Sequence, residues 1–143
     1  MNRQEFVLAV LAAGDAVEHN STQVQKLFFL LDRKVPEQVG GPWFAFQPYD
    51  YGPYDRAVYE ELRALTSRGL VSITKGKGAS RAYHLIPEGN AEGQVQLKKL
   101  PPATADYIRR LSAWVRRLSF EQLVSAIYRA FPDMSAKGVF RGA

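Results

Sequence analysis

The turn at Gly52-Pro53 constrains the fold of this chain more than any other feature, because one element must end there and a helix can begin. Proline locks its own φ angle and keeps the preceding residue out of the α region, so Gly52 is expected to be extended. Asp55 is placed to cap a helix, and Gly69 is placed to stop it. The pattern predicts a helix over residues 55–68. Its apolar face consists of Val58, Leu62 and Leu65.

A basic β-hairpin is predicted directly after this helix. Residues 70–74 and 81–86 alternate between apolar and polar side chains, and a basic, glycine-bearing turn over residues 75–80 joins them. The phrase over residues 83–89 also resembles the exit from the wing in many winged-helix regulators. A helix, a glycine stop and a basic hairpin in this order indicate a winged-helix module.

Amphipathic patterns predict helices in the rest of the chain. Capping-box patterns open two of them, at Thr22–Gln25 and at Ser119–Gln122. The pattern over residues 90–100 is weak, whereas the one over residues 103–118 is strong. Between the second helix and the turn, the alternation around Phe44 and Phe46 allows a short strand. The expected helices cover residues 3–13, residues from Thr22 onward, 90–100, 103–118, and residues from Ser119 to Pro132.

These elements predict an α+β fold that is mainly helical: a winged-helix-like domain with a β-hairpin wing and additional C-terminal helices. We expect residues 1–100 to form the winged-helix-like part. Residues 101–143 would be a helical extension packed on the same core, so that the chain is a single domain. With 143 residues and 46% hydrophobic content, the chain is long enough for one ordinary core.

The composition limits the chemistry that this chain can perform. It has no cysteine, which excludes disulfides, thiolate nucleophiles and cysteine-bound metals. Its two histidines are His19, expected to be solvated or capping in a polar segment, and His84, expected on the surface of a strand. No catalytic group is spaced to act with another, so we expect a non-enzyme without cofactor or metal. The chain shows neither a long apolar run nor a secretion signal, which predicts a cytoplasmic protein that does not bind membranes.

Positive charge is concentrated in the last third of the chain. Residues 1–97 carry 10 basic and 11 acidic side chains, whereas residues 98–143 carry 9 and 3, within a net charge of +5. A nucleic acid would be drawn to such a region and to the basic hairpin. The expected nucleic-acid contacts are Lys75, Lys77, Arg81, Arg109, Arg110, Arg116 and Arg117. For the four helical arginines, an ordinary solvated face is the alternative.

The helix over residues 55–68 suits DNA less well than the hairpin does. Its acidic residues offset its arginines, and carboxylates facing phosphates would weaken binding. The tyrosines around the turn are amphipathic and are typical of protein interfaces, although tyrosines that anchor a loop by packing give the same pattern. The expected contacts with a protein partner are Tyr49, Tyr51, Tyr54, Arg56, Tyr59 and Arg63.

Two phrases of the chain together resemble a known family. Residues 22–30, TQVQKLFFL, and residues 51–54, YGPY, followed by a helix and Gly69-Leu70-Val71, resemble the Panacea (SocA-like) antitoxin domain. The resemblance covers about residues 3–86. It implies a winged-helix-like, non-catalytic protein that neutralises a toxin or serves as an adaptor or regulator. It assigns no role to the basic C-terminal region.

Three functions therefore remain open. The first is an antitoxin-like or adaptor protein that binds a toxin or a regulatory protein and that could also bind DNA. The alternatives are a sequence-specific DNA-binding transcriptional regulator and a small basic ribonuclease toxin. Val139 and Phe140 in the C-terminal segment could dock on this chain or on a second copy, so a homodimer is also considered.

Overall fold

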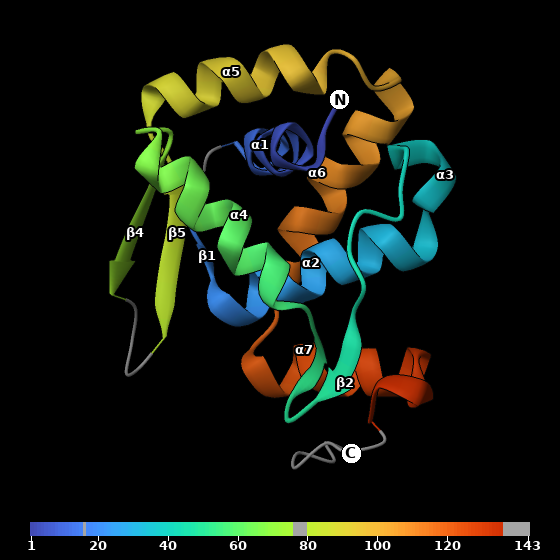
Figure 1. The fold of residues 1–143 in the computed structure, drawn as a ribbon. Coiled ribbons are helices and arrows are strands. Elements are labelled where there is room, and N and C mark those ends of the chain that lie inside the picture. The colour runs from blue at the N-terminus through green and yellow to red at the C-terminus, as the bar shows by residue number, and fades with distance from the viewer. Residues whose placement is uncertain (16, 76–79, 136–143) are drawn as a thin grey trace.

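The computed structural model describes residues 1–15, 17–75 and 80–135, which form a mixed α+β fold dominated by helices (Figure 1). The helices are α1 (Arg3–Ala13), α2 (Ser21–Lys34), α3 (Pro36–Val39), α4 (Arg56–Ser67), α5 (Pro87–Leu97), α6 (Pro102–Arg117) and α7 (Phe120–Ala130), followed by the 3-10 turn η1 (Pro132–Ser135). The strands are β1 (His19–Asn20), β2 (Gln47–Tyr49), β3 (Gly52–Tyr54), β4 (Val71–Lys75) and β5 (Arg81–Leu85). The prediction of a mainly helical α+β fold is confirmed.

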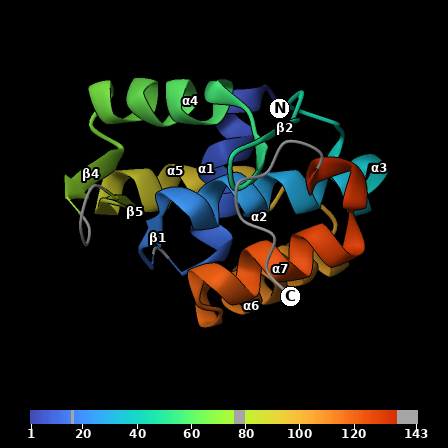
Figure 2. The ribbon, with the colours of Figure 1, turned by 90° about the horizontal axis from the view of Figure 1, so that it is seen from below.

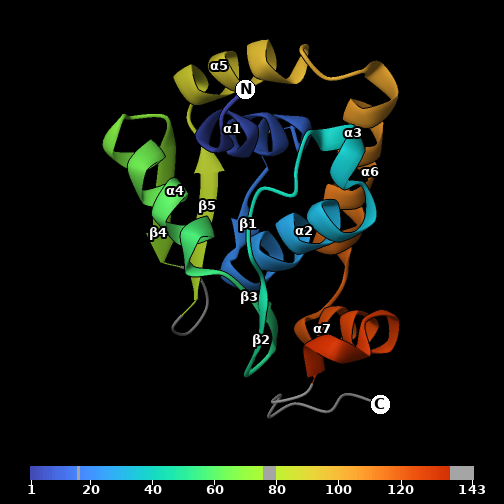
Figure 3. The same cartoon turned by 45° about the vertical axis from the view of Figure 1, so that its right-hand side comes forward.

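The predicted hairpin is formed by β4 and β5. The two strands pair in antiparallel register, with Val71 opposite Leu85 and Lys75 opposite Arg81. The short strand β1 pairs with the other edge of β5, which gives the sheet order β1-β5-β4. Residues 76–79 of the predicted turn lie outside the described residues. The sheet stands at one side of the molecule, next to α4 (Figure 3).

A second hairpin, made of β2 and β3, is absent from the sequence-based prediction. Its strands pair antiparallel, with Tyr49 opposite Gly52. The strand expected around Phe44 and Phe46 does not form, because both rings pack on phenylalanines of α2 at centroid distances of 5.6 Å. Strand pairing starts only at Gln47, where the chain leaves this aromatic cluster.

Helix α4 forms as predicted. The Asp55 side chain caps it by accepting a hydrogen bond of 2.9 Å from the backbone N–H of Ala57. Gly69 follows the helix with a φ of +76°, in the left-handed region that glycine adopts easily. Gly52 lies in a strand, as expected of an extended residue, but its φ of +106° also favours glycine. The three residues predicted to face inward, all with no exposed surface, are Val58, Leu62 and Leu65.

Helices α1 and α2 form the centre of the fold. Residues 6–13 of α1 are all buried, which is more than the one face that an amphipathic pattern predicts. The reason is that α4, α5 and α6 each pack against α1 from different directions. In α2, burial is continuous from Val24 to Asp32 and includes three polar residues.

The capping box of α2 differs from the predicted one. The cap lies two residues earlier, at Asn20: Asn20 Oδ1 accepts from the Gln23 N–H at 2.9 Å, and Gln23 Oε1 accepts from the Asn20 N–H at 2.8 Å. Thr22 is therefore inside the helix. The Gln25 side chain cannot serve as the predicted partner, because it bonds to the backbone of Asp55.

The weak helix predicted over residues 90–100 is present as α5, which begins at Pro87 and packs closely on α1 (Figure 1). Glycine makes this approach possible. A Cβ atom at Gly93 would lie 2.6 Å from the carbonyl oxygen of Leu8 and 2.7 Å from the Cβ of Ala12. The contact therefore leaves no room for any side chain at position 93.

Helices α6 and α7 cover the side of α2 that lies opposite α4 (Figure 2). Ser119 and Gln122 form the capping box predicted for α7, with the Ser119 Oγ 3.1 Å from the Gln122 N–H. Both helices contribute to the same core as α1 and α2. Their fully or almost fully buried residues include Ile108, Val115, Leu123 and Ile127.

His19 is fully buried, so the expectation of a solvated or capping residue is wrong. Pairing of β1 with β5 places it in the interior, where its Nε2 lies 2.8 Å from the Oγ of Ser112 on α6. The Arg116 Nε donates to the same oxygen at 3.4 Å. Burial, together with the positive charge of Arg116, lowers the pKa of His19 to about 4.

Substituting Gly93 tests the close packing of α5 on α1. Alanine favours a helix over glycine by about 1 kcal/mol, yet Gly93→Ala should lower the free energy of unfolding by about 1–3 kcal/mol, because the new Cβ overlaps the backbone of α1. Urea denaturation measures the change. Val95→Ala, at a position 58% exposed on the same helix, is the control and should be nearly neutral. Wild-type stability of Gly93→Ala would contradict the described contact.

Burial of His19 predicts a pH-dependent stability. Its folded pKa of about 4 lies below the ordinary value of 6.5, so between these values the unfolded chain binds more protons than the folded chain. The free energy of unfolding should therefore fall by about 2 kcal/mol when the pH is lowered from about 7 to about 5.

Urea denaturation at both pH values tests this, with His19→Gln expected to flatten the dependence. The control, His84→Gln, removes the other histidine, which is half-buried on β5. An equal pH dependence in wild type and His19→Gln would contradict the assignment.

Candidate functional site

Two neighbouring polar side chains of α2 hold the β2–β3 hairpin in place. Gln25 pairs with the backbone of Asp55 in both directions: its Nε2 donates to the carbonyl oxygen at 2.9 Å, and its Oε1 accepts from the N–H at 3.0 Å. The Lys26 Nζ donates to the carbonyl oxygen of Pro53 at 3.3 Å. Gln25 and Lys26 are only 2% and 5% exposed. Since buried polar groups require hydrogen-bond partners, these contacts fix the hairpin relative to α2.

Lys26 lies in an unusual environment for an amine. Burial lowers its pKa to about 8, and no carboxylate within the described residues forms an ion pair with it. Its aliphatic stem fills the space beside Gly52, where a Cβ would lie 3.3 Å from the Lys26 Cε. Lysine at position 26 and glycine at position 52 are therefore matched in shape.

Asp32, farther along α2, holds the segment that leads into the hairpin. Its two carboxylate oxygens accept hydrogen bonds of 2.8 Å from the N–H groups of Trp43 and Phe44. Burial raises the pKa of Asp32, while these two bonds act in the opposite direction. The Trp43 ring stacks on Phe6 of α1 at a centroid distance of 5.1 Å. One helix thus positions the connection from residue 43 to residue 55 at several points.

Four tyrosines form a continuous row across the hairpin, α4 and the sheet. Tyr49 stacks on Tyr54 at 5.1 Å, Tyr54 contacts Tyr59 at 5.9 Å, and Tyr59 lies nearly parallel to Tyr83 at 6.1 Å. Tyr49 at the outer end is 56% exposed, whereas Tyr83 at the inner end is buried. The sequence left packing and contact open for these tyrosines, and the row shows packing along its length with exposure at the hairpin end.

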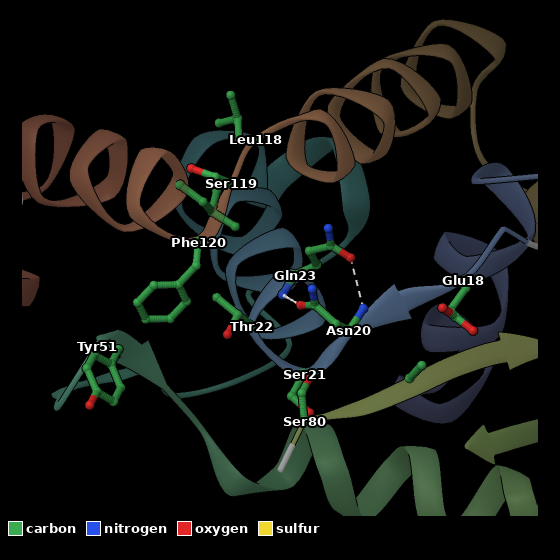
Figure 4. A pocket seen from close by; sticks show the side chains of 12 residues that line it. Glu18, Asn20, Ser21, Thr22, Gln23, Tyr51, Ser80, Leu118, Ser119 and Phe120 are labelled. Atoms are coloured by element: carbon green, nitrogen blue, oxygen red, sulfur yellow. Dashed lines mark hydrogen bonds between the residues drawn. The ribbon is translucent and has the colours of Figure 1, made fainter. Parts of the chain in front are cut away.

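Tyr51, at the tip of the same hairpin, borders a separate pocket of about 850 Å³ (Figure 4). Tyr51 is 48% exposed, and its ring makes an edge-to-face contact with Phe120 on α7 at a centroid distance of 5.3 Å. The other end of the pocket is polar and includes Glu18 and the capping box of α2. The hairpin tip therefore presents aromatic surface next to a hollow.

A groove of about 340 Å³ lies between α4 and the sheet. Tyr59 and Tyr83 contribute their stacked rings to it, and the hydroxyl of Tyr59 donates to the carbonyl oxygen of Ser21 at 3.2 Å. Exposed arginines enter it from both walls: Arg63 from α4 and Arg81 from β5. The lining residues are Ser21, Tyr59, Arg63, Ile73, Arg81 and Tyr83.

The carboxylates of α4 do not neutralise this groove. Glu61 points to α1 and pairs with Arg3 at 2.6 Å, and Glu60 pairs with Arg56 at 3.5 Å. Within the described part of the chain, neither Arg63 nor Arg81 forms an ion pair. The expectation that acidic residues offset all arginines of α4 is therefore wrong for Arg63, because the helix directs its charges to different sides.

The structure separates the predicted nucleic-acid contacts into two groups. Lys75 is exposed at the end of β4, opposite Arg81, while Lys77 lies outside the described residues. The arginines of α6 belong to the side of α2 opposite α4 (Figure 2). There, Asp106 pairs with Arg110 at 3.0 Å and with Arg109 at 3.9 Å. Of the other two, Arg116 bonds to Ser112, and Arg117 is exposed.

Two features bear on the ribonuclease alternative. The His19 Nε2 and the Ser112 Oγ are within hydrogen-bond distance, but both side chains are fully buried, so a substrate has no access to them. Across residues 1–15, 17–75 and 80–135, no group of three His, Asp or Glu side chains could hold a metal ion. We assign no reaction to these groups.

Sequence reasoning missed the residues that organise this site. Gln25, Lys26 and Asp32 carry a recognisable signal, since they are polar positions within a buried, mostly apolar stretch of α2. No sequence signal marks Ser21 and Tyr83, because their role in the groove depends on how β5 lies against α2 and α4.

In comparisons with known proteins, no family model, curated protein or solved structure matches this chain. None of the helices in the described part of the chain is long and apolar enough to cross a membrane.

The pairing of Gln25 with Asp55 predicts a specific destabilisation. Gln25→Ala removes two hydrogen bonds and should lower the free energy of unfolding by about 1–3 kcal/mol. Hydrogen exchange should also accelerate at the amide of Asp55, which loses its acceptor. Gln38→Ala, at an exposed position on α3, is the control. Unchanged exchange at Asp55 in a folded Gln25→Ala variant would show that Gln25 does not anchor the hairpin.

Proposed function

We propose that this chain is a non-catalytic, winged-helix-like binding protein that docks a protein partner, as an antitoxin or adaptor does. The order of elements supports the fold part of this proposal. Helix α4 leads directly into the β4–β5 hairpin, and the short strand β1 between α1 and α2 pairs with that hairpin in the order β1-β5-β4. In this arrangement α4 corresponds to the helix before the wing, and β4–β5 to the wing.

The proposal of a protein partner is based on the exposed tyrosines of an anchored hairpin. Tyr49 and Tyr51 are 56% and 48% exposed. Their hairpin is nevertheless fixed, because Gln25 and Lys26 of α2 form hydrogen bonds with its backbone and with the residue that follows it. Aromatic side chains on a rigid support bind with little loss of conformational freedom, which is why tyrosines dominate many protein interfaces. The resemblance of residues 51–54 and 22–30 to the Panacea antitoxin domain agrees with this surface, since both phrases supply it.

Site-specific photo-crosslinking tests this proposal. A photoreactive phenylalanine analogue placed at position 49 should crosslink a partner in cells of the native host, and mass spectrometry identifies that partner. The control carries the analogue at position 95, which is similarly exposed on α5. Labelling of the same proteins from both positions would contradict a dedicated interface at the hairpin.

Binding of the identified partner should then depend on Tyr49. Because interface tyrosines often contribute at least about 2 kcal/mol, Tyr49→Ala should weaken binding by about thirtyfold or more in calorimetric titration. The exposed position predicts that the variant stays folded, which a thermal melt checks. Val95→Ala should bind as wild type does. Equal affinities of the Tyr49→Ala and Val95→Ala variants would reject the tyrosine surface.

A DNA-binding transcriptional regulator is the second candidate function. The observation that favours it is the groove beside α4, where Arg63 and Arg81 face an opening lined by no carboxylate. Lys75 adds a third cation next to Arg81. Protein binding at the tyrosine hairpin and nucleic-acid binding at this groove would use adjoining parts of one face, so the two functions are compatible.

A further inference from the structure

We propose that the groove between α4 and β4–β5 is an oxyanion site in which Arg63 and Arg81 hold one phosphate of a nucleic-acid backbone. This inference rests on the second candidate function and specifies which residues perform it. It also sets the four arginines of α6 apart from the binding surface.

The groove has a positive charge that no described residue compensates. Its lining contains two arginines and no acidic side chain, so two positive charges border the groove without compensation from the described residues. Arginine presents a planar fork of donors that matches phosphate oxygens. Other arginines near α4 are already committed, Arg56 to Glu60 and Arg68 to Glu92. Arg63 and Arg81 are thus the pair that remains available for an external anion.

The neutral groups of the groove also suit an anion. Burial raises the pKa of Tyr59 to about 12, with a further contribution from nearby Tyr83, so Tyr59 remains uncharged and does not repel a phosphate. Ser21 connects the groove to β5 through two hydrogen bonds with the backbone of Arg81, at 3.3 and 3.4 Å. These bonds hold the start of β5, and with it the base of the Arg81 side chain, in a defined place.

The aromatic residues indicate that the backbone, rather than a base, is bound here. Nucleic-acid bases bind single-strand proteins by stacking on exposed aromatic faces. In this groove Tyr59 contacts Tyr54 and stacks on Tyr83, and Tyr83 is buried. The rings beside the arginines are therefore engaged with one another, which leaves the arginines as the groups that suit a ligand. Contacts to phosphate position a nucleic acid without reading its sequence, so this subsite should be indifferent to sequence.

The position of Lys75 favours a polymer over a single free phosphate. Lys75 lies directly opposite Arg81 in the strand register, at the outer end of the hairpin. Because residues that pair directly lie on the same face of a sheet, Lys75 extends the positive charge of Arg81 beyond the groove. A phosphate chain can therefore contact Arg63, Arg81 and Lys75 in turn.

Titration of a labelled DNA duplex at several salt concentrations tests the proposal. Loss of one phosphate contact reduces the salt slope by about 0.9 and lowers affinity about eightfold near 0.1 M salt. We expect this result for Arg63→Ala and for Arg81→Ala. The matched control is Arg117→Ala, which removes the same charge from an exposed position on α6 and should change affinity less than twofold.

Each outcome decides between defined alternatives. If the wild type binds duplex and the groove variants match Arg117→Ala, the second candidate function stands and this inference is wrong. If the wild type binds no duplex even at about 50 mM salt, the second candidate function fails, and the inference fails with it.

A second titration then identifies the true ligand, using backbone amide shifts of Arg81 and Tyr83 as the readout. Shifts caused by inorganic tripolyphosphate, and absent in Arg63→Ala, would overturn the nucleic-acid proposal in favour of a free phosphate compound. Tighter binding of a phosphoserine peptide than of duplex would overturn it in favour of a phosphoprotein.

Discussion

The two-way hydrogen bonding between Gln25 and the backbone of Asp55 is the contact on which the position of the β2–β3 hairpin and of α4 depends. Asp55 occupies a junction: its backbone is held by α2, one carboxylate oxygen caps α4, and the other accepts the N–H of Ala45 at 2.7 Å. Placing Asp55 therefore places the end of the β2–β3 hairpin and the start of α4 together. Lys26 and Asp32 extend the same principle, in which buried polar groups of one helix bind the backbone of a long connection.

This arrangement explains how a chain of modest net charge can offer two different kinds of surface. On the hairpin, anchoring from α2 leaves the rings of Tyr49 and Tyr51 exposed on a fixed backbone, which suits a protein partner. Beside α4, the ion pairs of Glu60 and Glu61 turn negative charge away from the groove that contains Arg63. The basic helix α6 lies on the opposite side of α2, where Asp106 compensates part of its charge. Net charge along the sequence is therefore a poor guide to where positive charge is uncompensated in space.

Several elements could be predicted because their signals are local. The cap at Asp55, the stop at Gly69 and the alternation in β4 and β5 each lie within a few residues, and all three are present in the structure. The sequence-based predictions were wrong where two local patterns competed. Asn20 and Thr22 both precede a glutamine by three residues, and only the engagement of Gln25 elsewhere selects Asn20 as the cap. The alternation around Phe44 and Phe46 likewise allowed a strand, whereas both rings pack on α2 and strand pairing begins at Gln47.

The sequence by itself determined the longer helices, the β4–β5 hairpin and the mainly helical α+β class, because capping residues and apolar periods act over short distances. Only the tertiary structure decided which polar side chains are buried and which charges remain uncompensated. Gln25 and Asp55 are 30 residues apart, and His19 and Ser112 are 93 residues apart, so no local pattern could pair them. The groove with Arg63 and Arg81 arises in the same way, since it exists only where α4 and β5 meet. Burial and charge compensation depend on neighbours in space, and the order of residues along the chain does not specify those neighbours directly.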